Sequence, residues 1–147
     1  LNSGCSFEEI FGLNNNDIYI DSFQSFVSIR SNSNRKISNI YKIRTIPLIG
    51  ISHHASKMML KYFVSNTMVN VKNSHRFKYK INKIFKDITN NKPLASVKNT
   101  LISRLINIRC PEEVILELIG KSKRHSLYNN DVSLDIKKIW LEQLESG

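Results

Sequence analysis

Tyr128 is the side chain whose type and place most favour covalent chemistry in this chain of 147 residues. It stands in the stretch LYNNDVSLDIKKIWLEQL, eight residues after Gly120, which ends the apolar stretch CPEEVILELIG. A tyrosine hydroxyl can form covalent intermediates, but its pKa of about 10 makes it a weak nucleophile at neutral pH unless neighbouring groups activate it. The alternative interpretation is a packing residue ahead of a terminal helix.

Basic side chains recur at places where they could bind phosphate. Lys98 lies in a helical stretch beside apolar residues, and Lys121, Lys123 and Arg124 form a basic turn after Gly120. A planar guanidinium can hold a phosphate through two parallel hydrogen bonds, whereas an ammonium acts as a point charge. For each of these positions, phosphate contact and simple solvation are equally good interpretations.

The net charge of +10 and the isoelectric point of about 9.8 favour a polyanionic partner, usually a nucleic acid. The alternative is a solvated surface, because lysine is abundant together with asparagine and isoleucine, as expected from AT-rich coding DNA. No pattern indicates a metal or a cofactor. His53 and His54 are adjacent, so on a helix they point apart, and there is no glycine-rich phosphate loop.

Nothing in the sequence indicates a membrane segment or a secretory leader. No apolar run approaches the roughly 18 residues needed to cross a bilayer, and no basic-then-apolar leader stands at the front. The chain opens with Leu1, so we expect a processed start or a cut from a longer protein. Cys5 and Cys110 lie far apart, and we expect small buried hydrophobes in a reduced, cytoplasmic protein.

The hydrophobic pattern predicts one α+β domain over residues 1–147, mostly helical, with a small antiparallel sheet near the N-terminus. Residues 6–13 suit a short helix. Residues 18–31 are typical of a strand with local alternation, and residues 41–50 of a second strand that Pro47 and Gly50 end. We expect two or three strands in this part of the chain.

A helical period begins at Ser52 and continues toward the C-terminus. Pro111 suits the first turn of a helix that Gly120 stops. The other predicted helices each carry one apolar face, and lysines lie largely outside the face of residues 77–88. These faces are formed by Ala55, Met58, Met59 and Tyr62; by Phe77, Ile81, Ile84, Phe85 and Ile88; by Val97, Leu101, Leu105 and Ile108; and by Leu134, Ile136, Ile139, Trp140 and Leu144.

Four segments, in order, resemble the catalytic domain of the tyrosine recombinases, the phage-integrase family. NSGCSFEEIFGLNNNDI is similar to the segment with the family's first arginine and a glutamate three residues later, and RKISNIYKIRTIPLIG to its lysine-bearing β-hairpin. ASVKNTLISRLINIRCPEEVILELIGK is similar to its histidine-x-x-arginine helix and the following helix, and YNNDVSLDIKKIW to its nucleophile and C-terminal helix. The resemblance implies DNA transesterification, in which the tyrosine attacks phosphorus, releases a 5′-hydroxyl and leaves a 3′-phosphotyrosine.

The resemblance keeps the nucleophile as Tyr128 and the accompanying glutamate as Glu9. Ser6 stands at the position of the first arginine and Lys98 at that of the second. Ser38 stands at the position of the hairpin lysine. In the family, the two arginines stabilise charge on the nonbridging oxygens, and the lysine protonates the leaving oxygen.

Three further positions also depart from the family pattern. Ala95 replaces the histidine of the histidine-x-x-arginine phrase, Asn99 the histidine after it, and Lys121 the histidine or tryptophan that follows the helix-ending glycine. Each lost preorganised donor costs about 3–4 kcal/mol of transition-state stabilisation, so we expect cleavage to be impaired or lost. We also expect Ala95 and Lys121, with Ser6 and Lys98, to surround one basic concavity that has Tyr128 at its rim.

The resemblance implies a DNA-binding homologue of site-specific recombinases, with duplex DNA as its partner and phosphate contacts from Lys36, Lys42, Arg44, Lys123 and Arg124. Family members usually carry a separate N-terminal DNA-binding domain, which is missing from this sequence. They also exchange C-terminal helices between protomers, here residues 134–144, which implies a homo-oligomer. Two alternatives stay open: a noncatalytic DNA- or protein-binding regulatory module derived from an integrase, and a remnant without DNA affinity.

Overall fold

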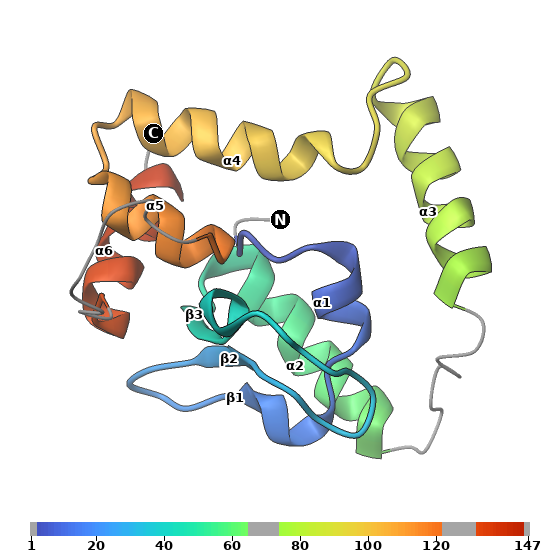
Figure 1. Ribbon diagram of the computed structural model, residues 1–147, viewed down its shortest axis with the longest axis horizontal. Coiled ribbons are helices and arrows are strands. Elements are labelled where there is room, and N and C mark those ends of the chain that lie inside the picture. Colours follow the sequence, from blue (N-terminus) through green and yellow to red (C-terminus); the bar gives the residue numbers. More distant parts are fainter. Residues whose placement is uncertain (1–2, 65–73, 122–131, 146–147) are drawn as a thin grey trace.

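The computed structural model describes residues 3–64, 74–121 and 132–145, so Tyr128, Lys123 and Arg124 lie outside the described residues. The structure confirms a mostly helical α+β fold with a small antiparallel sheet near the N-terminus (Figure 1). The elements, in chain order, are α1 (Phe7–Phe11), the 3₁₀ turn η1 (Asn15–Asp17), β1 (Ile18–Tyr19), β2 (Phe26–Ile29), the 3₁₀ turn η2 (Ile40–Lys42), β3 (Arg44–Pro47), α2 (Gly50–Val64), α3 (Ser74–Ile88), α4 (Ser96–Asn107), α5 (Glu112–Ile119) and α6 (Leu134–Glu145).

The sheet has the strand order β1–β2–β3, and both neighbouring pairs are antiparallel. Val27 lies opposite Ile18 on one side and Ile46 on the other, so these three buried residues share the core face. The prediction of one strand over residues 18–31 is wrong, because the chain turns back between β1 and β2. Asp21 and Ser25 hold this turn with hydrogen bonds of 3.2 Å and 3.0 Å.

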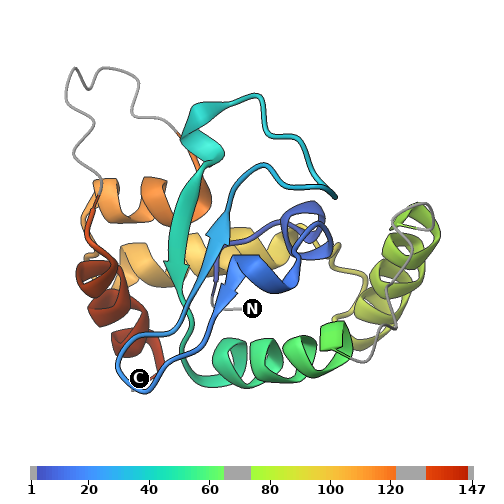
Figure 2. The same cartoon turned by 90° about the horizontal axis from the view of Figure 1, so that it is seen from below.

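The hydrophobic core lies between the sheet and the helices α4, α5 and α6. Ile29 and Ile46 of the sheet are fully buried against Leu105, Leu118 and Leu141, one residue from each of the three helices. In Figure 2, α5 and α6 lie on one side of the sheet, and α3 lies at the opposite end of the molecule. The hydrophobic core therefore lies far from α3.

Both cysteines lie in or against this core as free thiols. Burial, and to a smaller extent the charge of Glu113, raise the pKa of the Cys110 thiol to about 11. Burial also raises the pKa of the Cys5 thiol. Each thiol stays protonated at neutral pH and packs as a small apolar group.

Helix α2 packs through a different face from the one that the sequence predicts. Met59 and Phe63 pack against the core, whereas Met58 is 46% exposed and Ile51 is 76% exposed. The buried Ser52 stabilises the start of the helix, because its hydroxyl accepts a hydrogen bond from the Ile49 amide (3.0 Å) and donates one to the Ile49 carbonyl (2.7 Å). An apolar line along α2 stays at the surface.

Helix α6 packs on its own chain, against β3, α4 and α5. Leu141 and Leu144 enter the core, and the Lys137 side chain is 3% exposed. The Lys137 ammonium lies 2.8 Å from the Glu117 carboxylate and donates to the Thr45 carbonyl at 3.2 Å. Among the residues that the structure describes, no helix is both long and apolar enough to cross a membrane.

We expect Leu105→Ala to lower the free energy of unfolding by about 3–4 kcal/mol, because it opens a cavity among fully buried side chains. Ile106→Ala is the matched control, since Ile106 follows on the same helix and is 58% exposed. This control should cost less than about 1 kcal/mol. Urea unfolding measures both, and equal losses would show that α4 faces the core differently.

Candidate functional site

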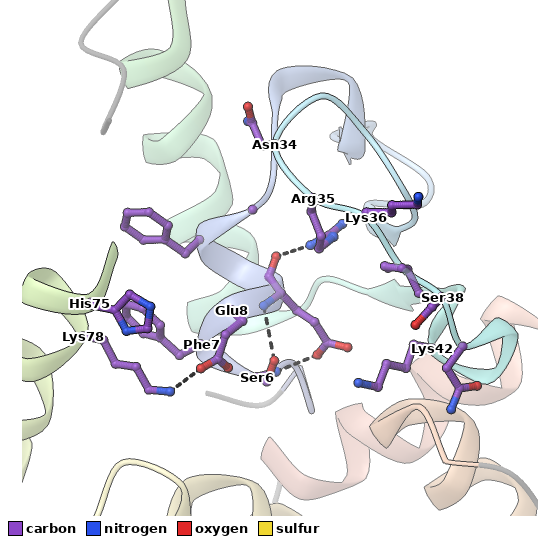
Figure 3. Close-up of a pocket in the computed structure, with 15 residues that line it drawn as sticks. Ser6, Phe7, Glu8, Asn34, Arg35, Lys36, Ser38, Lys42, His75 and Lys78 are labelled. Carbon is purple, nitrogen blue, oxygen red and sulfur yellow. Dashed lines mark hydrogen bonds and ion pairs between the residues drawn. The ribbon is translucent and has the colours of Figure 1, made fainter. Parts of the chain in front are cut away.

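A pocket of about 500 Å³ lies between α1, the loop of residues 34–42 and the start of α3 (Figure 3). Its lining includes five of the residues that the sequence places at the functional site: Ser6, Glu9, Lys36, Ser38 and Lys42. Arg35, His75 and Lys78 add further basic groups. Three separate parts of the chain therefore meet at one basic concavity.

Ser6 and Glu9 begin α1 as a reciprocal cap. The Ser6 hydroxyl accepts a hydrogen bond from the Glu9 amide (3.2 Å), and the Glu9 carboxylate accepts one from the Ser6 amide (2.7 Å). The spacing Ser-x-x-Glu is the sequence signature of this capping box. The sequence therefore carries a structural signal for Ser6 that is independent of any arginine position. The serine hydroxyl carries no charge and already has a structural partner.

Glu9 also forms a buried ion pair with Arg44. The two guanidinium NH₂ groups lie 2.8 Å and 3.1 Å from the two carboxylate oxygens, and the Arg44 side chain is only 2% exposed. The Arg44 guanidinium donates further to the carbonyls of Leu118 (3.1 Å) and Lys42 (2.9 Å). The prediction that Arg44 contacts DNA is wrong for this arrangement, because the guanidinium is buried and its donors are engaged within the protein.

The pKa of Glu9 lies below its usual value. Burial alone would raise it, but the hydrogen bonds and the positive charge of Arg44 outweigh burial, and Lys98 contributes in the same direction. The carboxylate is consequently ionised at neutral pH. Its negative charge balances the positive charges of Arg44 and Lys98, which lie at the end of α5.

Lys98 and Arg44 together cap the C-terminal end of α5. The Lys98 ammonium donates a hydrogen bond to the Ile119 carbonyl at 2.7 Å, next to the Leu118 carbonyl that Arg44 holds. Helix carbonyls carry partial negative charge at this end, which favours cations. Gly120 has a φ of 69°, and a side chain there would come within 2.6 Å of the Arg44 guanidinium. A glycine is therefore required where the sequence predicts the helix to stop.

Lys98 is half-buried and its pKa is lowered. Burial is the main cause; the negative charge of Glu9 opposes the shift, and the positive charges of Arg44 and Lys121 add to it. Lys121 is exposed and close enough to act on Lys98 through its charge. These two lysines thus belong to the cluster around Glu9 and Arg44, although they do not line the pocket.

The remaining predicted residues are placed differently. Ala95 is exposed, precedes α4 and provides no side-chain cap. Lys36, Ser38 and Lys42 are exposed on the pocket loop, and Figure 3 shows the Lys42 side chain directed into the pocket. Of the four residues expected around one concavity, only Ser6 lines this pocket. Tyr128, Lys123 and Arg124, also expected at the site, lie outside the described residues.

The α3 side of the pocket was not predicted from the sequence. Phe77 packs against Phe7 and Phe11 of α1, with ring centroids 6.3 Å and 5.8 Å away, and Lys78 pairs with Glu8. The amphipathic pattern predicts the helix itself, but no local signal shows that it folds back onto α1. Within residues 3–64, 74–121 and 132–145, no group of three or more His, Cys, Asp or Glu side chains could hold a metal ion.

Compared with protein-family models, curated proteins and solved structures, the chain gives no match.

We expect Glu9→Gln to lower the free energy of unfolding by about 3 kcal/mol at pH 7, because it leaves the Arg44 charge buried without its counterion. Because the pKa of Glu9 is lower in the folded state than its unfolded value of about 4.3, the ionised carboxylate stabilises the fold at pH values above about 4.3. This stabilisation is lost as the pH falls through the folded-state pKa. The difference in free energy of unfolding between wild type and Glu9→Gln should therefore become smaller below about pH 4.

The matched control for this experiment is Glu8→Gln, which makes the same change one residue earlier. Glu8 is exposed in its pair with Lys78, so its loss should cost less than about 1 kcal/mol. Urea unfolding at pH 7 and below pH 4 measures both variants. Equal losses, or a Glu9→Gln effect that does not change with pH, would contradict a stabilising Glu9–Arg44 pair.

Proposed function

We propose that the chain is a DNA-binding homologue of the site-specific tyrosine recombinases, in which strand cleavage is impaired or lost. The supporting observation is the meeting of Ser6, Glu9, Ser38 and Lys42 at one pocket. In the sequence these residues lie in two separate segments that resemble the arginine segment and the hairpin of the family. Their convergence is what a phosphate-binding site of that type needs.

The pocket suits the sugar-phosphate backbone of duplex DNA as a ligand. Lys36 and Lys42 bring positive charge from the loop, and Ser38 brings a hydroxyl. Such groups neutralise phosphates and release counterions, so binding falls steeply as salt rises. Phosphate contacts of this kind orient a protein on the duplex without reading its sequence. The same proposal implies a cytoplasmic protein of bacterial or phage-derived origin.

Impaired cleavage follows from the state of the groups that would stabilise the transition state. Ser6 is neutral and caps α1, and the Lys98 ammonium is hydrogen-bonded to the end of α5. The absence of one preorganised donor lowers the rate by roughly 10²–10³. The same observations favour a second candidate, a noncatalytic regulatory module derived from an integrase that still binds DNA or a partner protein.

The proposal includes a homo-oligomer formed by exchange of α6 between protomers. In the structure α6 lies on its own chain, where Lys137 is paired with Glu117. Exchange would replace this contact with the same contact in another copy, so the buried charge would keep its partner. No new interaction is needed for this step.

We expect the protein to shift duplex DNA in a salt-sensitive manner but to form little or no covalent adduct with a nicked suicide substrate. Tyr128→Phe should abolish any adduct and leave binding unchanged, because it removes only the attacking hydroxyl. Tyr19→Phe is the matched control on an exposed tyrosine of β1. A denaturing gel detects the adduct and a mobility shift detects binding.

The outcomes of this experiment separate the candidates. Rapid adduct formation that requires Tyr128 would show an active recombinase and contradict impaired cleavage. DNA binding without an adduct supports the proposal and the noncatalytic module alike, and a requirement for Lys36 and Lys42 would assign the binding to the pocket. No binding even at low salt would contradict the DNA-binding function.

A further inference from the structure

Charge is unevenly distributed along the chain. Residues 74–92, which form α3 and the loop after it, carry six lysines and arginines and a single acid, Asp87, which gives this stretch a net charge of +5. Residues 112–145 carry five lysines and arginines and seven acids, a net charge of −2. Figure 1 places α3 at one end of the molecule and α5 and α6 at the other. A polyanion is therefore attracted to the α3 end.

Helix α3 is attached to the rest of the protein along one side. Phe77 contacts the two phenylalanines of α1, and the Asn82 side chain accepts a hydrogen bond from the Leu94 amide at 2.9 Å. Ile81 and Phe85 are half-buried on this side. The rotation of α3 is fixed by these contacts, so the opposite side of the helix faces solvent.

His75, Tyr79, Lys83 and Lys86 form a line along the solvent side of α3, which we call the α3 line. Their spacing of four, eight and eleven residues keeps them on one side of a helix with 3.6 residues per turn. All four are exposed, and no ion pair of Lys83 or Lys86 is found among the described residues. The line starts at the pocket, because His75 belongs to the pocket wall.

The length of this line fits a stretch of duplex backbone. Eleven residues of helix rise about 16 Å, which corresponds to roughly five base steps at about 3.4 Å each. The wall on the other side of the pocket carries Lys36 and Lys42. A rod-shaped polyanion crossing the pocket mouth can contact both walls at once, whereas a globular acidic protein would need a matching protrusion.

We propose that the α3 line is a second contact for the DNA backbone, which runs from the loop of residues 34–42 across the pocket onto Lys83 and Lys86. This inference rests on the proposed DNA-binding function and adds to it a path for the duplex. Glu8 opposes this path, because it lies at the pocket and neutralises Lys78. Removing the Glu8 charge would leave Lys78 available to a phosphate.

We expect Lys83→Gln/Lys86→Gln to reduce the slope of log K against log salt concentration by about 1.8, since each phosphate contact contributes about 0.9. Lys57→Gln/Lys61→Gln on α2 is the matched control, because both lysines are exposed, lie four residues apart and remove the same charge. This control should change the slope by less than half as much. Fluorescence anisotropy with a 20-base-pair duplex measures both variants.

The possible results separate the inference from the function on which it rests. If wild type does not bind the duplex in a salt-dependent manner, the proposed function fails. If wild type binds but the α3 variant matches the α2 control, only the α3 line is wrong. The exposed Ile84 and Ile88 make anionic lipid the rival ligand. If the α3 variant loses binding to phosphatidylserine vesicles but retains duplex binding, the ligand of the α3 line is a membrane surface and not DNA.

We expect Glu8→Gln to strengthen duplex binding and to steepen the salt slope by about 0.9, because Lys78 then becomes one additional phosphate contact. Glu112→Gln is the control, since Glu112 is an exposed acid in the first turn of α5, away from the pocket. It should leave the slope unchanged. Weaker or unchanged binding by Glu8→Gln, measured in the same anisotropy assay, would contradict a backbone path over the pocket.

Discussion

The buried ion pair between Glu9 and Arg44 is the interaction on which the rest of the site depends. Glu9 belongs to α1 and Arg44 to β3, and the same guanidinium reaches the last turn of α5. A buried arginine without a carboxylate is strongly unfavourable, so burial of Arg44 requires α1 to lie beside β3 and the end of α5. The floor of the pocket is thereby built on a charge balance and not on apolar packing alone.

This charge balance also accounts for the partners of Ser6 and Lys98. With Arg44 held by Glu9, the position of Ser6 needs no second cation, and a serine begins α1 with a cap. Lys98 finds a backbone carbonyl as its partner. A serine at the start of α1 and a lysine that caps the end of α5 are therefore compatible with a stable fold.

Local patterns allowed much of the fold to be predicted. All three helices α3, α4 and α6 form where their apolar periods predict them, and the predicted face of α4 packs into the core. The predicted faces of α3 and α6 are partly wrong, because Ile84, Ile88, Ile136 and Ile139 are exposed and α6 buries Lys137 and Leu141 instead. Helix α5 ends at the predicted Gly120, because only a residue that tolerates positive φ fits against Arg44. The small sheet was also expected, although the turn at Asp21 divides one predicted strand. The rotation of α2 was not predictable, since apolar residues lie on two of its faces and only Met59, Leu60 and Phe63 pack against the core.

The site was harder to predict because its key contacts join distant residues. The pairing of Glu9 with Arg44 spans 35 positions, and that of Lys78 with Glu8 spans 70. Neither pair has a local sequence signature, so Arg44 was expected at the surface and α3 was not expected beside α1. The capping box at Ser6 does have a local signature, because its serine and glutamate lie only three positions apart.

The ammonium of Lys137, enclosed between Glu117 and the Thr45 carbonyl, has a consequence for any exchange of α6. A helix that carries a buried cation can pack stably only where a carboxylate and a carbonyl oxygen are positioned to pair with that cation. A copy of the same chain supplies both, whereas an unrelated groove of similar shape would leave the ammonium dehydrated and unpaired. This one lysine would thus make helix donation homotypic: identical protomers would accept the helix, and merely hydrophobic surfaces would reject it.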